Sequence, residues 1–245
     1  MFRLEDVRKH RAQGDSAFEL QVPSLEIHPG EMIAVVGESG CGKSTLLDLL
    51  ALVLRPTSSQ VFRFTEPNTG HSVDAAALWA GGHEDALAHL RRAHMGYVLQ
   101  TGGLLPFLDV RRNIELSARV SGREPVAVSE LASQLGIDNC LDRMPAALSI
   151  GQRQRVAIAR AVAHGPALVL ADEPTAAVDK ARGAQIMERL AMLARQQGTA
   201  VVVVTHDRPL VEPLVARGYG FAVSAISDEL TVSVCRPLER WKAAS

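Results

Sequence analysis

The stretch Gly37-Glu38-Ser39-Gly40-Cys41-Gly42-Lys43-Ser44-Thr45 fits the phosphate-loop pattern G-x-x-x-x-G-K-[ST]. The apolar run at 33–36 before it predicts a short buried strand, and the apolar run at 46–52 after it predicts a helix. In such a unit, glycines allow backbone N–H groups to approach phosphate oxygens, and the positive end of the helix dipole points to the same place. The pattern therefore predicts a site for the phosphates of a nucleotide. The alternative is a glycine-rich turn without a ligand.

The side chains of this loop suggest distinct chemical roles. Lys43 is expected to bridge the β- and γ-phosphates, and the hydroxyl of Ser44 is expected to hold Mg²⁺. The other loop positions that we expect to contact the nucleotide are Gly37, Ser39, Gly40, Cys41, Gly42 and Thr45. The expected ligands are therefore a nucleoside triphosphate and magnesium.

The composition of the chain narrows the classes of protein to consider. With 245 residues, 47% of them apolar, the chain is long enough to bury a sizeable core. Its net charge of −1 gives no global basic field, so no nucleic-acid partner is expected. Cys41, Cys140 and Cys235 have neither paired nor metal-like spacing, which is typical of a reducing cytosol. The longest apolar runs are too short to span a bilayer, so any membrane role is expected to come through a partner.

The remainder of the chain predicts an α/β fold on a mainly parallel sheet. Continuous apolar runs at 167–171 and 200–204 alternate with helical patterns, as in parallel strands covered on both faces. Residues 1–36 alternate apolar and polar side chains in places, which predicts an antiparallel lead-in. Residues 103–165 are almost entirely helical in pattern and are the candidate for a helical subdomain. Residues 66–86 are expected to form a surface loop or a short insertion.

Polar residues follow several of the predicted strands. In a parallel sheet, ligands bind at the carboxyl ends of the strands, so Gln100, Asp172, Glu173 and His206 are expected to share one site with the phosphate loop. Asp172 is placed to support Mg²⁺. Glu173 can polarise an attacking water as a general base. His206 can bond the γ-phosphate, and Gln100 can serve the metal shell or the water. The alternative for Asp172 and Glu173 is a simple acidic cluster at the start of a helix. The alternative for Gln100 and His206 is a purely structural role.

The stretch 148–155 offers a second anion site. Ser149 and Gln152 have the S-x-x-Q spacing of a capping box that opens a helix at 150–163. A well-capped helix is the simpler interpretation. The sharper hypothesis is a second phosphate site, because Ser149, the N–H of Gly151 and the helix N-terminus all favour anions. One chain needs only one phosphate loop for one nucleotide, so a separate anion site suggests that two copies meet with nucleotide between them.

Taken in order, these motifs resemble those of the nucleotide-binding subunits of ATP-binding cassette (ABC) transporters, from about residue 2 to 235. The matching segments are Gly37–Thr45 (Walker A), Gln100 (Q-loop), Leu148–Gln152 (signature LSGGQ), Leu168–Asp172 with Glu173 (Walker B), Ala176–Asp179 (D-loop) and His206 (H-loop). Within the family, the stretch 104–114 looks most like the lipoprotein-release, macrolide-export and cell-division branch.

The resemblance implies an ATPase that works as a head-to-tail dimer with two ATP molecules and Mg²⁺ at its interface. Lys43, Asp172 and Glu173 of one copy would face Ser149 and Gly151 of the other, and Gln152 and Asp179 would complete the composite site. A transmembrane permease would dock near residues 100–120. The cassette would then be cytoplasmic and peripheral on the inner face of the cell membrane.

The same resemblance implies one domain over 1–245. A RecA-like, phosphate-loop NTPase core would comprise 1–100 and 166–245, and a helical subdomain would be inserted at about 101–165.

Among the departures of the chain from the family pattern, two bear directly on the nucleotide site. Ile150 replaces the first glycine of LSGGQ, and its branched side chain restricts the backbone there. Where an aromatic residue often stacks on adenine, this chain has His10 and Arg11, and Arg11 can stack through its planar guanidinium. A soluble cassette protein acting on nucleic acid or the ribosome is one alternative function. A nucleotide-gated scaffold with little hydrolysis is another: Glu173 argues against it, and Ile150 keeps it open.

Overall fold

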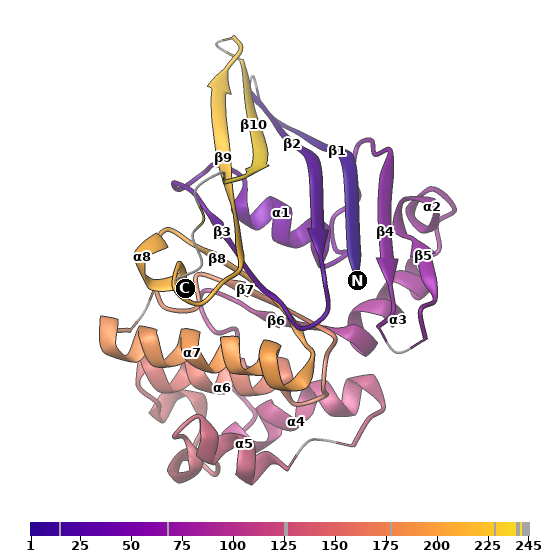
Figure 1. Ribbon diagram of the computed structural model, residues 1–245. Helices are drawn as coiled ribbons and strands as arrows, with labels where there is room; N and C mark the ends of the chain where they lie inside the picture. The colour runs from indigo at the N-terminus through magenta and orange to yellow at the C-terminus, as the bar shows by residue number, and fades with distance from the viewer. Residues whose placement is uncertain are drawn as a thin grey trace.

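The computed structural model describes residues 1–14, 16–67, 69–124, 127–176, 178–227, 229–238 and 241. Within these residues one sheet of ten strands runs in the order β5-β4-β1-β2-β10-β9-β3-β8-β7-β6 (Figure 1). The strands are β1 (Phe2–Gln13), β2 (Ser16–Ile27), β3 (Met32–Val36), β4 (Val61–Thr65), β5 (Ser72–Asp74), β6 (Met95–Val98), β7 (Leu168–Asp172), β8 (Ala200–Thr205), β9 (Arg217–Ala225) and β10 (Leu230–Pro237). The helices are α1 (Lys43–Leu50), α2 (Ala75–Ala80), α3 (Glu84–His94), α4 (Val110–Ser121), α5 (Val128–Gln134), α6 (Ile150–Val162), α7 (Lys180–Gln197) and α8 (Arg208–Val211).

The sheet has a parallel half and a largely antiparallel half. Strands β6, β7, β8, β3 and β9 pair in parallel, whereas β1 pairs antiparallel with both β2 and β4. The predicted α/β fold with an antiparallel lead-in is therefore confirmed. Because the parallel strands run the same way, their carboxyl ends meet at one edge, which is where the phosphate loop leaves β3.

Two hydrophobic cores lie on opposite faces of this sheet. Alternate residues of the parallel strands point to different cores: Val202 packs in the core that contains α1, and Val203 packs in the core that contains α6 and α7. This alternation is the period of two expected of any strand, and here both faces are apolar because both are covered. In Figure 1, α6 and α7 lie together on one side of the strands, and α1 lies on the other.

The helical layer begins with a loop that is tied down by one buried amide. The side chain of Asn113, on α4, donates to the carbonyls of Leu105, Leu108 and Asp109 at 2.8–3.1 Å and accepts from the N–H of Leu105 at 2.9 Å. All of these partners are backbone groups, so the amide substitutes for regular secondary structure in fixing this loop. The approach to α4 is consequently a shaped surface.

The expectation of a surface loop at 66–86 is wrong for much of that segment. Residues 72–74 form the edge strand β5, which pairs antiparallel with β4. Asp74 then caps α2 by accepting from the N–H of Ala77 at 3.0 Å, and α3 begins at Glu84. The turn residues Gly70 and Gly81 separate elements too short to show a periodic pattern, and pairing at the sheet edge supplies the order that local sequence does not.

Candidate nucleotide site

The phosphate loop joins the end of β3 to the start of α1 through positions that require glycine. A Cβ on Gly37 would lie 2.6 Å from the sulfur of Cys41, and Gly42, at φ 104°, precedes the first turn of α1. Because Gly42 has no side chain to cap the helix, the first N–H groups of α1 remain available to a ligand. The helix dipole adds a positive field at the same point. This loop therefore has the geometry of an anion site.

Lys43 is held across the mouth of the loop. Its ammonium donates to the carbonyls of Gly37 at 2.8 Å and Glu38 at 2.7 Å. Phosphate oxygens that accept from the loop N–H groups would meet this ammonium at short range, and a hydrogen bond between two charged groups is the strong kind. The predicted role of Lys43 thus fits its position.

Ser44 and Asp172 form the pair predicted to hold Mg²⁺. The hydroxyl of Ser44 donates to Oδ2 of Asp172 at 3.0 Å, although the two residues are far apart in sequence. Burial raises the pKa of Asp172, and the charge of Glu173 raises it further. The hydrogen bond from Ser44 and the positive charge of Lys43 oppose the rise. A hydroxyl and a carboxylate are hard oxygen ligands, which suit magnesium, and a cation here would offset the cost of ionising Asp172.

Glu173 and His206 make a second contact beside this pair. Nδ1 of His206 lies 3.0 and 2.9 Å from the two carboxylate oxygens of Glu173. Glu173 is only 8% exposed and adopts φ 45°, which is uncommon for a residue with a side chain. Such backbone strain persists only where surrounding contacts enforce it, and the N–H of Glu173 is held by the carbonyl of Val204 at 2.9 Å. The carboxylate is consequently fixed in direction.

A single cavity of about 670 Å³ collects most of the predicted site. The predicted residues that line it are Arg11, Ser39, Gly40, Gly42, Lys43, Ser44, Thr45, Gln100, Asp172, Glu173 and His206. Gly37 and Cys41 belong to the same loop but do not line the cavity, and burial raises the pKa of the Cys41 thiol. The carboxyl ends of four parallel strands therefore bring the phosphate loop, Gln100, the Ser44–Asp172 pair, Glu173 and His206 to one place, as the sequence predicts.

The sequence analysis missed an aromatic residue of this cavity. Phe18, on β2, lies directly opposite Arg11 in the β1–β2 register, and both line the cavity. Arg11 also reaches Asp48 on α1, with a nitrogen–oxygen distance of 3.7 Å. The turn at Gly14 could have revealed this pairing, because a tight hairpin turn fixes which residues face each other. Ser16, Ala17 and Thr231 also line the cavity and were not predicted.

The predicted signature residues lie outside this cavity. Ser149 caps α6: its hydroxyl accepts from the N–H of Gln152 at 3.2 Å, and the Gln152 side chain accepts from the N–H of Ser149 at 2.9 Å. The predicted capping box is therefore confirmed. Ile150 is the first residue of α6 and is 56% exposed, so its branched side chain projects from the helix start without breaking the cap.

Gly151 and the D-loop lie next to each other. A Cβ on Gly151 would lie 3.3 Å from the side chain of Val178. Asp179 caps α7 by accepting from the N–H of Arg182 at 3.0 Å, and this hydrogen bond lowers the pKa of its carboxyl. Ala177 of the predicted D-loop lies outside the described residues. The starts of α6 and α7 thus form one outward-facing end of the molecule.

A glycine loop between strand and helix, with a hydroxyl–carboxylate pair and a fixed glutamate at neighbouring strand ends, defines a phosphate-loop nucleotide-binding protein. A family model described as ABC transporter matches residues 20–176, which is more than half of the chain, and the chain belongs to that family.

The chain is similar in sequence to curated macrolide export proteins. It is 42% identical over 212 residues to the macrolide export ATP-binding/permease protein MacB of Shigella flexneri, covering 84% of this chain and 31% of that protein. The MacB protein of Escherichia coli strain K12 is 41% identical over the same length. The chain therefore spans about a third of the length of these relatives.

Solved structures give the same assignment. The dimeric structure of MJ0796, a bacterial ABC transporter cassette, matches with a TM-score of 0.78 and 32% identity, covering 90% of this chain and 94% of that one. The dimeric post-hydrolysis state of MJ0796 bound to ADP and Pi matches with a TM-score of 0.77. The predicted ABC family, the fold class and the ATPase class are confirmed. The MacB relatives agree with the predicted lipoprotein-release, macrolide-export and cell-division branch. The roles of individual site residues and the division into core and subdomain stay predictions.

Proposed function

We propose that this cassette hydrolyses MgATP and that ATP-driven closure of two copies powers a membrane transporter or a membrane-remodelling complex. The proposal rests on one observation: two side-chain pairs lie next to each other in the same cavity. The Ser44–Asp172 pair and the Glu173–His206 pair meet beside the phosphate loop, which supplies a metal position and a base position around one triphosphate site.

Each group then has a defined task. Lys43 and the loop N–H groups hold the phosphates, and Ser44 and Asp172 would hold Mg²⁺, which when bound neutralises phosphate charge. Glu173 accepts a proton from the attacking water. His206 orients the Glu173 carboxylate by contacting both of its oxygens, and it is exposed on its other side, toward the cavity. Gln100 lines the same cavity and would position the water or the metal shell.

The second anion site belongs to a partner copy in this proposal. The Ser149 hydroxyl accepts from α6, so its own hydrogen is free to donate to a phosphate. Ser149 is exposed and Gly151 stands with it at the open end of α6. The dimeric state of the structural neighbour MJ0796 supports two-copy closure, with Gln152 and Asp179 holding the two helix starts. Phe18 and Arg11 would face the base.

A permease is the proposed membrane partner. Exposed apolar side chains lie before α4 and at its end: Phe107, on the approach to α4, is 70% exposed, and Val120, in the last turn of α4, is 59% exposed. A nearby cavity of about 390 Å³ between α3 and α4 is lined by apolar side chains that include Tyr97 and Leu116 and by basic ones that include Arg91 and Arg160. Such a surface suits a partner segment with an apolar face, near the predicted docking region of 100–120. The relatives named above are ATP-binding/permease proteins, which supports a place on the inner face of the cell membrane.

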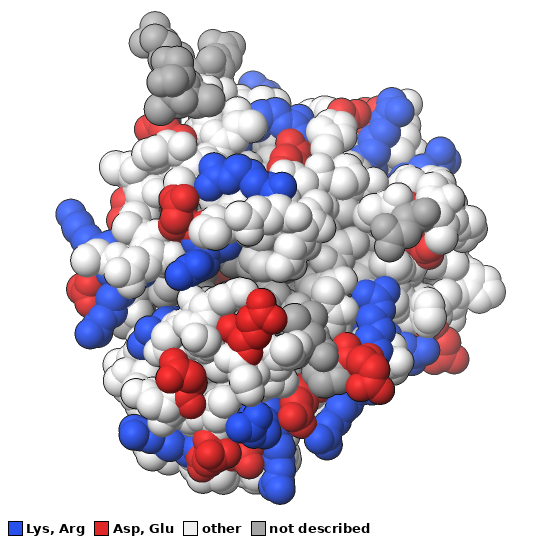
Figure 2. Space-filling view, turned by 60° about the horizontal axis from the view of Figure 1, so that its bottom comes forward, with Lys and Arg blue, Asp and Glu red and all other residues white. Residues whose placement is uncertain are grey.

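No described helix is long and apolar enough to cross a bilayer. The face shown in Figure 2 intersperses Lys and Arg with Asp and Glu, so this face offers no continuous basic surface for nucleic acid. That observation favours the permease over the nucleic-acid alternative.

The proposal is tested by measuring phosphate release and molar mass of the purified cassette. With MgATP we expect turnover and a rise to twice the monomer mass, neither of which occurs when magnesium is chelated. An ATP-dependent dimer without turnover would support the scaffold alternative. If ATP binds but causes neither turnover nor dimerisation, the proposed motor function is overturned.

A further inference from the structure

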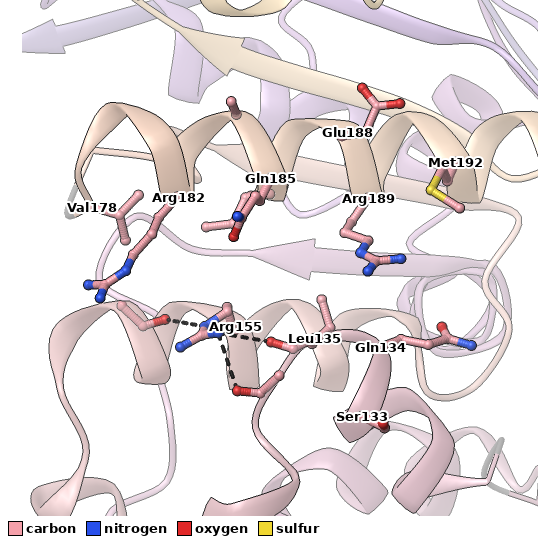
Figure 3. A pocket seen from close by; sticks show the side chains of 14 residues that line it. Ser133, Gln134, Leu135, Arg155, Val178, Arg182, Gln185, Glu188, Arg189 and Met192 are labelled. Atoms are coloured by element: carbon pink, nitrogen blue, oxygen red, sulfur yellow. Dashed lines mark hydrogen bonds between the residues drawn. The ribbon is translucent and has the colours of Figure 1, made fainter.

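A second large groove lies between α7 on one side and α5 and α6 on the other (Figure 3). Its volume is about 730 Å³, which is within the range of small-molecule sites. Its described lining residues include none of those that line the nucleotide cavity. The groove is therefore separate from the nucleotide cavity, and it touches the proposed second anion site at Gly151.

The charge of this groove is positive. Arg182 and Arg189 extend from α7 into it, and Arg155 lies on the facing side (Figure 3). Glu188 is the one carboxylate among the described lining residues. It points to the opposite side of α7 in Figure 3, where it pairs with Arg195 at 3.2 Å. The groove therefore presents cations without an inward-facing acid.

The three arginines differ in how they are engaged. Arg155 donates to the carbonyls of Leu135 and Gly136 at 3.1 and 3.2 Å, and Arg182 lies 3.5 Å from Asp179. In the part of the chain that the structure describes, Arg189 makes no hydrogen bond or ion pair. An unengaged guanidinium beside a held one offers planar donors to an anion.

The groove becomes apolar toward the end of α7. A smaller hollow of about 170 Å³ continues it and shares Arg189 and Met192 with it. The walls of this hollow include the aliphatic side chains of Leu131, Ile158, Val162 and Leu193, with uncharged Gln134, Gln196 and Gln197 beside them. From Arg182 to the end of α7 the helix rises roughly 22 Å. The combined groove is thus elongated, with cations at one end and in the middle and aliphatic side chains at the other.

We propose that this groove binds a linear organic anion with an aliphatic tail, its head at Arg182 and Arg189 and its tail between Leu131 and Leu193. The gradient of charge and apolar surface along α7 supports this ligand class over a compact anion, which would leave the aliphatic end unused, and over a neutral lipid, which would leave Arg189 unpaired.

Occupation of the groove would regulate the ATPase, a consequence that rests on the proposed function. Gly151, at the start of α6, and Val178, just before α7, line the cationic end. A ligand clamped between these helices would fix the two helix starts relative to each other. We therefore expect bound ligand to change the ATP dependence of dimerisation, whereas binding itself needs no nucleotide.

The test uses calorimetry on the full chain without nucleotide, below micelle-forming concentrations. Sodium dodecanoate is the probe; acetate supplies the head alone, and dodecyltrimethylammonium supplies the tail with a cationic head. We expect saturable one-to-one binding of dodecanoate and at least about tenfold weaker binding of the other two.

Variants on α7 locate the site. Arg189→Gln is expected to weaken dodecanoate by about tenfold, the scale of one lost charge-assisted contact, whereas Arg195→Gln on the same helix but outside the groove leaves binding unchanged. Equal affinity for both dodecyl probes, or no effect of Arg189→Gln, would overturn the proposal. Binding of an aspartate-rich peptide in place of dodecanoate would overturn it in favour of a protein partner. Because ATP is absent, a failure here leaves the ATPase proposal standing.

Discussion

The nucleotide cavity and the start of α6 are constructed in opposite ways. In the cavity, Glu173 is buried, strained and fixed by His206, and Asp172 is fixed by Ser44. At the start of α6, Ser149 and Ile150 are exposed and are held by their own capping box. One chain therefore fixes the side chains of the proposed catalytic half in place, whereas it leaves the proposed partner-facing half exposed. The difference explains why closure of two copies, rather than local rearrangement, would complete the site.

The largest expected effect comes from the fixed half. Glu173→Gln keeps the size of the side chain and removes the base, so ATP turnover should fall by roughly 10²–10⁴-fold. Bound ATP should then accumulate with the closed dimer, visible as a doubled mass by light scattering. Glu212→Gln, which alters a surface carboxylate paired with Arg208, is the matched control. Unchanged phosphate release in Glu173→Gln would remove this residue from catalysis.

The next effect separates binding from chemistry. Lys43→Ala removes the ammonium that is expected to bridge the β- and γ-phosphates, so the affinity for ATP should fall by at least about 100-fold. Calorimetry with ATP measures this directly. Lys9→Ala should bind normally, because the Lys9 ammonium contacts the carbonyl of Arg55 away from the cavity. Retained nucleotide affinity in Lys43→Ala would contradict the assignment of the phosphate loop.

A smaller effect is expected in the exposed half. Ser149→Ala removes the hydroxyl proposed to reach the partner's nucleotide, and turnover should fall by about tenfold while ATP binding to the monomer is retained. Loss of the cap should also cost about 1 kcal/mol of unfolding free energy. Gln152→Ala breaks the same capping box but keeps the hydroxyl, so it should share the stability loss and spare more of the turnover.

Mixing two variants sharpens this prediction. In a head-to-tail dimer, a Lys43→Ala chain and a Ser149→Ala chain together contain one intact composite site. Turnover should therefore rise above that of either impaired chain alone when the two are mixed, in proportion to the mixed dimers formed. Failure of the mixture to regain turnover, with mixed dimers present, would show that both halves act within one chain.

Local patterns account for most of what the sequence could predict. The phosphate loop, the buried strands and the capping box each depend on residues close together in the chain, so their types and spacing are visible without the fold. The carboxyl-edge rule for parallel sheets extended this to Gln100, Asp172 and His206. These predictions concern which residues meet, and the cavity brings them together.

The features that were missed depend on tertiary geometry. Phe18 enters the cavity through strand register, and the direct contact of His206 with Glu173 requires two separate strand ends to be placed within hydrogen-bond distance. The left-handed backbone of Glu173 has no signal in residue type, since such a conformation favours glycine. The edge strand β5 gains its order from β4 rather than from its own three residues.

The smallest expected effect concerns the stability of the fold. It measures how much the buried carboxylate of Asp172 destabilises the chain, apart from any role in ATP turnover. Because burial raises the pKa of Asp172, the unfolded chain loses this proton at a lower pH than the folded chain does. The ionised carboxylate therefore destabilises the metal-free fold increasingly as pH rises above the unfolded value of about 3.9, until Asp172 is fully ionised. Asp172→Asn should raise the melting temperature near neutral pH, and its advantage should shrink as acid protonates the native carboxyl.

Magnesium completes this comparison. Magnesium added together with ATP should stabilise the native cassette more than it stabilises the Asp172→Asn variant. The reason is that the amide of the variant lacks the charge that attracts the cation. The measurement is a set of melting curves at several pH values, with and without magnesium. A variant less stable than the native chain at neutral pH would show that Asp172 is held by its contacts more than it is penalised by burial, and that the catalytic half is not built at the expense of stability.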